Sequence, residues 1–157
     1  MSGFRRGVRL GIDVGRARVG VARCDPDGML AVPVETVARD EASIDRIIAI
    51  AGEYEPLEFV VGLPVNMQGT DTPSTTDARE FAAALQRQSG TPVRLVDERL
   101  STVTAHAALR SSGRSQKKSR SIVDQVAAVV LLQQAIDMEK STGNPAGATI
   151  PSDEEHA

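Results

Sequence analysis

The stretch VRLGIDVGRARVGVARCD, residues 8–25, decides how the chain begins to fold. Two apolar runs, 8–14 and 17–24, are separated by Gly15 and Arg16 and followed by the turn sequence DPDG, which predicts a β-hairpin. Asp13 lies between Ile12 and Val14, inside the first of these strands. A carboxylate in such a position is costly unless it is paired, neutralised or bound to a cation. Asp13 is therefore the first candidate functional residue.

The elements that follow extend the hairpin into a mixed sheet. Residues 29–37 predict a third strand, with Pro33 indicating an edge position. Helical spacing of apolar residues then alternates with short apolar strands, and right-handed crossovers favour parallel pairing for the later strands. We expect strands near 59–61 and 91–98, and helices near 41–54, 74–89, 101–111 and 121–139. This order predicts an α/β, ribonuclease H-like fold. Its mixed five-stranded sheet has three antiparallel strands, then two parallel ones, and is flanked by helices.

Length and composition favour one domain followed by a tail. The chain has 157 residues, enough to bury a core. We assign residues 1–140 to a single domain with the ribonuclease H-like fold. Residues 141–157 carry Asp153, Glu154 and Glu155 and no Lys or Arg, so we expect a disordered acidic tail there.

Several functional classes are disfavoured by composition. No apolar run approaches a membrane span, and the N-terminal residues MSGFRRG do not resemble a signal peptide, so a cytoplasmic protein is expected. The single Cys24 fits a reducing compartment, and one Cys with only two His residues excludes a zinc cluster of the usual kind. Aromatic residues are few, which argues against base stacking as the main mode of nucleic-acid binding.

Positive charge is concentrated in two regions despite the net charge of −3. Six Arg residues lie within the first 23 residues, and RSSGRSQKKSR, residues 110–120, holds five basic residues and no acid. We expect the second region to be a loop preceding the last helix. Arg18 from the first region, and Lys117, Lys118 and Arg120 from the second, are candidate contacts for a nucleic-acid backbone.

Three acidic positions lie in otherwise apolar surroundings and converge in the expected fold. They are Asp13, one member of the Asp97–Glu98 pair at the end of the 91–98 strand, and Asp124 at the start of the last helix. Alternation along a strand allows only one of Asp97 and Glu98 to face the cluster, and it does not choose between them. Clustered carboxylates suit Mg²⁺ or Mn²⁺. Two such ions would support phosphodiester hydrolysis.

Four blocks of the sequence resemble those of the YqgF-type family, whose members are described as pre-16S rRNA nucleases or RuvX-like Holliday-junction resolvases. The blocks span roughly residues 8–139 and read GIDVGRARVGVARCD, VVGLPVNMQGT, VDERLST and VDQVAAVVLLQQ. The resemblance implies a ribonuclease H-like fold and divalent-metal hydrolysis of phosphodiester bonds. It also implies Asp13, Glu98 and Asp124 as the acidic triad, which selects Glu98 over Asp97. Arg16 and Ser101 depart mildly from the family pattern.

The substrate is less closely defined than the chemistry. Precursor ribosomal RNA and a four-way DNA junction both remain candidates, and the resemblance favours RNA processing. Symmetric junction cleavage favours a C2 homodimer, whereas RNA trimming is compatible with a monomer. The loop 66–70 is a candidate edge of the substrate site. Two other classes stay open at this stage: an actin-like or sugar-kinase nucleotide binder, and a non-catalytic nucleic-acid-binding module.

Overall fold

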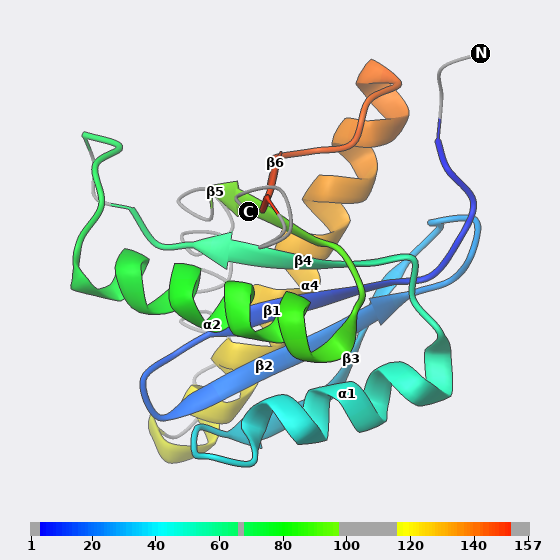
Figure 1. Cartoon of the computed structure of the whole chain (residues 1–157). Coiled ribbons are helices and arrows are strands. Elements are labelled where there is room, and N and C mark those ends of the chain that lie inside the picture. Colours follow the sequence, from blue (N-terminus) through cyan, green and yellow to red (C-terminus); the bar gives the residue numbers. More distant parts are fainter. Residues whose placement is uncertain (1–3, 66–67, 98–115, 152–157) are drawn as a thin grey trace.

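The sheet has six strands in the order β3-β2-β1-β4-β5-β6 (Figure 1). The computed structural model describes residues 4–65, 68–97 and 116–151, with the backbone alone for 116–124. Strands β1 (Arg9–Val14), β2 (Arg18–Cys24) and β3 (Ala31–Ala38) form an antiparallel meander. Strands β4 (Glu58–Leu63) and β5 (Val93–Asp97) run parallel to β1. The mixed α/β sheet predicted from the sequence is confirmed, as is the edge position of β3.

Helices cover both faces of the sheet. Helices α1 (Ser43–Tyr54) and α2 (Pro73–Ser89) lie on one face, and α4 (Gln116–Thr142) lies on the other (Figure 1). Alternation along β1 sends Leu10 and Ile12 into the core under α1 and α2. The core under α4 is smaller and is built from short side chains of β2 and β4 together with one apolar stripe of the helix.

Gly11 sets how closely α4 approaches the sheet. A Cβ atom at this position would lie 2.8 Å from Cβ of Leu132 and 2.9 Å from the carbonyl oxygen of Ala128. The helix therefore packs closely on β1 at Gly11, through the backbone at Ala128 and the side chain of Leu132. This contact fixes the height of α4 above the strand that carries Asp13.

The last helix begins earlier than the sequence predicts. The expected basic loop extends to residue 120, but α4 already begins at Gln116, so Lys117, Lys118 and Arg120 belong to a helix. Lys, Arg and Gln are good helix formers, and they continue the helix although they add no apolar stripe. The helix expected over 101–111 lies outside the described residues. No helix in the described part of the chain is long and apolar enough to span a membrane.

The segment after α4 joins the sheet, in contrast to the disordered tail expected from Ser141. Strand β6 (Ala148–Thr149) pairs antiparallel with β5 as a sixth strand. Ala146 is buried, and Ile150 packs against the core under α1 and α2. Gly147 permits this approach, because its positive φ of 74° and close packing on Leu95 leave no space for a side chain. The rest of the expected tail, residues 152–157, lies outside the described residues.

Candidate functional site

Asp13 lies on the face of the sheet that α4 covers. Its neighbours Ile12 and Val14 enter the core on the opposite face, and Gly11, on the same face as Asp13, contacts α4. Asp13 is half-buried and occupies the penultimate position of β1. The carboxylate thus belongs to the α4 side of the sheet, close to the carboxyl end of the strand.

Both strands that flank Asp13 carry glycine beside it. Gly20 of β2 is its cross-strand partner. On the other side, Ile12 pairs with Val61 of β4, so Gly62 is the next residue beside Asp13. Side chains of neighbouring strands in one row normally lie about 5 Å apart and fill the surface between them. Here neither register neighbour has a side chain, so the flanking strands add no side chain beside the carboxylate.

The end of β5 shows on which face of the sheet Asp97 lies, which alternation along the sequence could not decide. Val96 packs against the core under α4, and its partner on β4 is Gly62. Asp97 is the next residue; it is exposed and pairs with Leu63, whose side chain belongs to the core on the other face. Asp97 therefore does not share the face of Asp13. Glu98 lies outside the described residues.

Helix α4 brings the backbone of Asp124 to the same end of the sheet. Glu139 near its C-terminus contacts Arg9, whereas Ala128 and Leu132 contact Gly11, so α4 runs antiparallel to β1. Nε2 of Gln125 donates a hydrogen bond of 2.8 Å to Oγ1 of Thr36, and Thr36 pairs with Gly20 in the row of Asp13. The turn of α4 that holds Asp124 therefore lies over the row of Asp13.

Of the predicted nucleic-acid contacts, Arg18 is described in full. It is half-buried at the start of β2, on the same face as Ala22 and Cys24 and therefore on the face of Asp13. Lys117, Lys118 and Arg120 lie in the first turns of α4, where the structure describes the backbone. Of the loop 66–70, Asn66 and Met67 lie outside the described residues, and Gln68, Gly69 and Thr70 are exposed.

The residues described in full contain no cluster of three metal-ligating side chains. Glu98 and the side chain of Asp124, two of the three predicted ligands, are outside that set. The remaining one, Asp13, offers hard oxygen donors beside two glycines, which suits a divalent cation with oxygen ligands. The described geometry is therefore compatible with a carboxylate-bound Mg²⁺ or Mn²⁺.

The turn between β1 and β2 is held by residues that the sequence did not single out. Nη1 of Arg39 donates a hydrogen bond of 2.8 Å to the carbonyl oxygen of Gly15, two residues after Asp13. The same guanidinium binds both carboxylate oxygens of Asp77 in α2, at 2.9 and 2.8 Å. Hydrogen bonding to Arg39 holds the pKa of Asp77 below its ordinary value, so the pair stays ionised. No local pattern connects Arg39 with Asp77, which lie far apart in the sequence.

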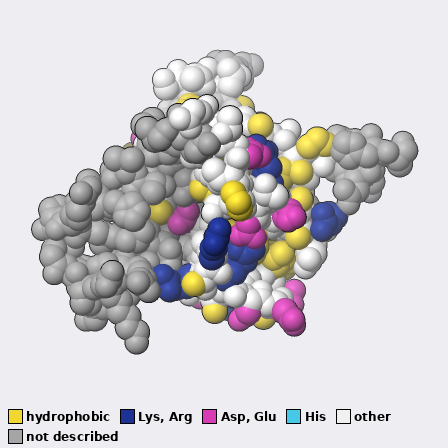
Figure 2. Space-filling model, turned by 90° about the vertical axis from the view of Figure 1, so that its left-hand side faces the viewer, with side chains coloured by type: hydrophobic (Ala, Val, Ile, Leu, Met, Phe, Trp, Pro, Cys, Tyr) yellow, Lys and Arg dark blue, Asp and Glu magenta, His cyan; other side chains and the backbone are white. Residues whose placement is uncertain are grey.

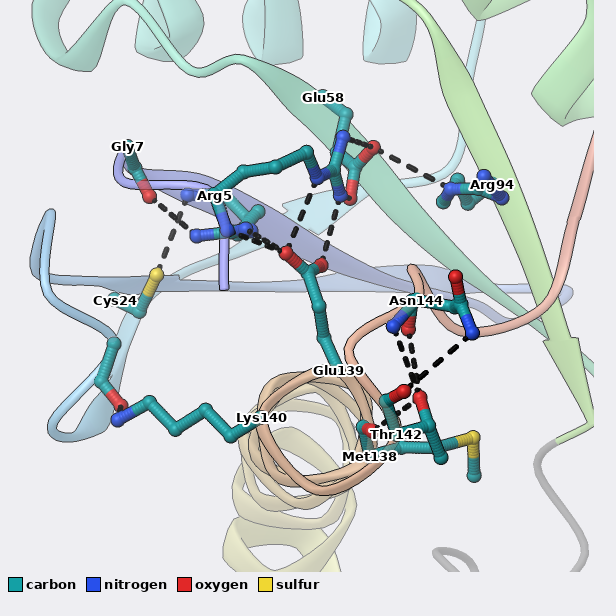
Figure 3. A network of polar contacts seen from close by, with 12 residues as sticks. Arg5, Gly7, Cys24, Glu58, Arg94, Met138, Glu139, Lys140, Thr142 and Asn144 are labelled. Carbon is teal, nitrogen blue, oxygen red and sulfur yellow. Dashed lines mark hydrogen bonds and ion pairs between the residues drawn. The ribbon is translucent and has the colours of Figure 1, made fainter. Parts of the chain in front are cut away.

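The opposite end of the same face carries a buried ionic network, shown in Figure 3, that the sequence analysis also missed. Glu139 accepts hydrogen bonds from Arg5 at 2.8 Å and from Arg9 at 2.9 Å, and Arg5 also binds Glu58 at 2.8 Å. Burial alone would raise the pKa of Glu139, but the hydrogen bonds from Arg5 and the charge of Arg9 outweigh it and lower the pKa. Glu58 and Glu139 are thus both paired with arginine at this end of the sheet.

Cys24 lies beside this network and is fully buried. Its Sγ accepts a hydrogen bond of 3.3 Å from the backbone N–H of Arg9. Burial raises the pKa of the Cys24 thiol, which therefore stays protonated near neutral pH. The residue acts as a small core side chain, and its burial argues against a disulfide between chains.

Comparison with known proteins places this arrangement in a family. The family model described as "RuvX: Holliday junction resolvase" matches residues 7–138. A protein of Leifsonia xyli subsp. xyli is 55% identical over 149 residues, which cover 94% of this chain and 96% of that protein. A protein of Clavibacter michiganensis subsp. michiganensis is 53% identical over 151 residues, 94% of each chain. Both carry the name "Putative pre-16S rRNA nuclease".

Solved structures with the same fold are more distant in sequence. Thermus thermophilus RuvC in complex with a Holliday junction substrate superimposes with a TM-score of 0.55 at 16% identity. The match covers 88% of this chain and 98% of that one. A second structure of Thermus thermophilus RuvC gives a TM-score of 0.53. At this identity the likeness concerns the fold alone, and it confirms the ribonuclease H-like fold predicted from the order of elements.

Proposed function

The chain belongs to the RuvX family, and on that premise we propose that it is a divalent-metal-dependent nuclease that processes the 5′ end of precursor 16S rRNA in the cytoplasm. The observation that carries the proposal is the setting of Asp13. This half-buried carboxylate stands between two glycines, on the face of the sheet that α4 covers and near the carboxyl ends of three parallel strands. Because both register neighbours are glycines, the strands on either side add no side chain next to this carboxylate.

We assign the catalytic and metal-binding carboxylates to Asp13, Glu98 and Asp124. Support for Glu98 comes from the strand register: Val96 faces α4 and Asp97 faces away, so continued alternation predicts that the next residue returns to the face of Asp13. Support for Asp124 comes from α4, where it lies one turn before Ala128, the residue that rests on Gly11. Both arguments are independent of the family pattern and agree with it.

The proposed ligands suit one or two Mg²⁺ or Mn²⁺ ions. Carboxylate oxygens are the ligands these hard cations prefer, and Gly20 and Gly62 leave room beside Asp13 for an ion and a phosphate. When bound, such ions lower the pKa of a water molecule and stabilise the leaving oxygen of a phosphodiester. The chain itself positions the carboxylates on rigid elements, because β1 is central in the sheet and α4 contacts it directly through Gly11.

Positive charge on the same face would bind the substrate backbone. Arg18 lies on the same face as Asp13, in the adjacent strand β2, two residues before Gly20. Lys117, Lys118 and Arg120 belong to the first turns of α4, which also contain Asp124. We propose these four residues as phosphate contacts. Backbone contacts of this kind recognise structured nucleic acid by shape and charge more than by base sequence.

A second candidate substrate is a four-way DNA junction. The family model carries the description of a Holliday junction resolvase, whereas the relatives at about half identity carry the name of an rRNA nuclease. We favour RNA because those relatives match nearly the whole chain. Junction resolution would need two symmetric cuts and therefore a C2 dimer, whereas a monomer suffices for RNA trimming.

The test compares wild type, Asp13→Asn and Asp97→Asn on two substrates, precursor 16S rRNA and a four-way junction, with Mg²⁺ or Mn²⁺. Asp97→Asn is the matched control, because it removes the same charge at the carboxyl ends of the parallel strands but on the other face of the sheet. We expect Asp13→Asn to cleave at least about 100-fold more slowly, as expected for loss of a group that stabilises transition-state charge. Asp97→Asn should cleave within about threefold of wild type.

Cleavage of both substrates by Asp13→Asn at the wild-type rate would refute the catalytic assignment. Preferential cleavage of the junction by the wild type, together with a dimer in solution, would replace the RNA substrate with the DNA one.

A further inference from the structure

A hollow lies at the end of the sheet where the β1–β2 turn follows Asp13. Its volume is about 440 Å³, it is open to solvent, and its lining residues are Arg16, Arg39, Pro73 and Asp77. Arg16 belongs to the β1–β2 turn, Arg39 follows β3, and Pro73 and Asp77 belong to the first turns of α2. Figure 2, which views the molecule from this side, shows basic and acidic side chains gathered near its centre.

Arg39 forms a fixed wall of the hollow. Its backbone N–H donates to the carbonyl oxygen of Ala17 at 3.0 Å, and its guanidinium is held by Gly15 and by both carboxylate oxygens of Asp77. The guanidinium also stacks on Phe81, at 4.8 Å from the ring centre. These contacts use three of the five donor hydrogens of the Arg39 guanidinium.

Arg16 contributes a second positive charge to the hollow, and this charge helps to lower the pKa of Asp77. It is exposed, and among the described residues it makes no hydrogen bond or ion pair. The one carboxylate in the hollow, Asp77, is already bound at both oxygens by Arg39. The hollow thus contains two guanidinium groups against one carboxylate, a net charge of +1.

The other acids beside the hollow in sequence are engaged elsewhere. Asp40, which follows Arg39, accepts a hydrogen bond of 2.8 Å from the backbone N–H of Ala42 at the start of α1. Asp71, close to Pro73, forms an ion pair of 2.9 Å with Arg79. Of these two acids, Asp71 is balanced by Arg79, whereas Asp40 keeps its negative charge outside the lining of the hollow.

We propose that this hollow binds a backbone phosphate of the nucleic-acid strand, with Arg16 as the contact and Arg39 as the residue that positions the turn. The inference rests on the proposed nuclease function, since it concerns the path of the same substrate. Arg16 is three residues after Asp13, so their Cα atoms are at most about 11 Å apart. Phosphates recur about every 3.4 Å of rise along a strand, which places the hollow within a few nucleotides of the reacting phosphate.

The path that this implies differs from the one suggested by Arg18 and the first turns of α4. Those residues lie on the α4 face, whereas the hollow is bounded by α2, on the other face of the sheet. A nucleic-acid strand that contacts both the hollow and the α4 face would pass over the β1–β2 turn at the end of the sheet. Arg16 therefore sets the direction in which the substrate leaves the acidic site.

The experiment measures binding of a fluorescein-labelled RNA hairpin with a single-stranded 5′ extension, in EDTA so that cleavage does not interfere. Arg16→Gln is compared with wild type, with Arg16→Lys, and with the control Arg6→Gln. Arg6 is exposed at the opposite end of the sheet and pairs with the exposed Asp27, so its loss removes the same charge elsewhere. Affinity is recorded by anisotropy between 0.05 and about 0.3 M salt, the range in which counterion release is resolved.

We expect Arg16→Gln to weaken binding about five- to eightfold at 0.1 M salt. One lost phosphate contact reduces the slope of log affinity against log salt by about 0.7–0.9, which gives this factor when extended to 1 M. Arg16→Lys should restore the slope, and Arg6→Gln should leave it unchanged. Equal slopes for Arg16→Gln and Arg6→Gln would overturn the proposal.

A scan with single methylphosphonate linkages along the extension then locates the contact. For wild type, neutralising one linkage near the cleavage position should weaken binding, and for Arg16→Gln that linkage should no longer matter. A uniform loss across all linkages would mean that Arg16 acts through the general field of the protein, which contradicts a site. These outcomes concern binding alone, so the cleavage assay with Asp13→Asn judges the nuclease function separately.

Discussion

The two ends of strand β1 each carry a charged side chain on the face that α4 covers, and the residues beside these two side chains differ. At the amino end, Arg9 is 2% exposed and binds Glu139, which also binds Arg5. At the carboxyl end, Asp13 stands between Gly20 and Gly62, which offer no side chain. Gly11 lies between these two ends and holds α4 against the strand.

Under the proposed function, this difference separates a charge that stabilises the fold from a charge that binds a ligand. A buried ionic group that stabilises a fold is surrounded by opposite charges and hydrogen bonds, as Glu139 is. A carboxylate that binds a ligand needs a rigid support and few side chains beside it; Asp13, proposed for this role, lies on a central strand between two glycines. One helix spans both ends, so α4 is anchored at its C-terminal half and presents its N-terminal half to the proposed site. Four changes test this division, from the largest expected effect to the smallest.

Removing the charge of Glu139 should cost the most stability. Glu139→Gln leaves Arg9 buried without its carboxylate, which typically destabilises by about 3–5 kcal/mol. The control Glu35→Gln removes an acid whose pair with Arg46 is partly exposed, and it should cost less than about 1 kcal/mol. Urea unfolding measures both. Cleavage per folded molecule should stay within about twofold for Glu139→Gln; similar losses of stability in the two variants would contradict a structural role for the network.

The same network predicts a defined response to acid. Because the folded-state pKa of Glu139 lies below its ordinary value of 4.5, its stabilising contribution is complete above that pH and is lost as pH falls through the lowered pKa. The difference in unfolding free energy between wild type and Glu139→Gln should therefore be constant from pH 5 to 7 and shrink below about pH 4.5. Urea titrations at several pH values test this, and a difference that grows on acidification would be inconsistent with the paired carboxylate.

Filling the contact between α4 and β1 should disturb both ends at once. Gly11→Ala places a Cβ within 2.8 Å of Leu132 and 2.9 Å of the Ala128 carbonyl, which should destabilise by about 1–3 kcal/mol. Gly52→Ala is the control: this helical position has nothing within 4 Å, and the change should stabilise by about 0.5–1 kcal/mol. Thermal melts compare the two, and no loss of stability in Gly11→Ala would show that α4 is not held by this contact.

The smallest effect is expected at the hydrogen bond that positions the early part of α4. Thr36→Val removes the acceptor of Gln125 and should cost about 0.5–1.5 kcal/mol. We also expect the Mg²⁺ concentration for half-maximal cleavage to rise, because Asp124 adjoins Gln125 on the helix. Thr149→Val, at an exposed position of β6, should change neither quantity. An unchanged Mg²⁺ requirement in Thr36→Val would separate this contact from the proposed site.

Local sequence patterns were sufficient for most of the fold. The hairpin of β1 and β2, the edge position of Pro33 in β3 and the alternation of helices with parallel strands all follow from periodicity and turn residues. Strand β6 was missed because two residues carry no periodicity, and it forms only through the approach of Gly147 to β5. The start of α4 was missed because its basic residues show no apolar stripe.

The candidate site was predictable only in part. Asp13 stands out locally because a carboxylate interrupts an apolar strand, but the glycines beside it become neighbours only in the sheet. The choice of Glu98 over Asp97 needed the family pattern. Alternation shows that the two side chains point to opposite faces, but it does not show which of them faces α4; the register of β5 places Asp97 on the other face. Glu58 and Glu139 resemble ordinary surface acids in sequence; their partners lie 53 and 134 residues away.

The most direct test of this division is the stability that Mn²⁺ confers, measured by urea unfolding of wild type, Asp13→Asn and Asp97→Asn with and without the ion. An ion that binds only the folded state stabilises it by about 2.7 kcal/mol at a concentration of 100 times its Kd. We predict this gain for wild type and Asp97→Asn, and its loss in Asp13→Asn. An equal gain in all three proteins would contradict the assignment of Asp13 to a metal-binding site.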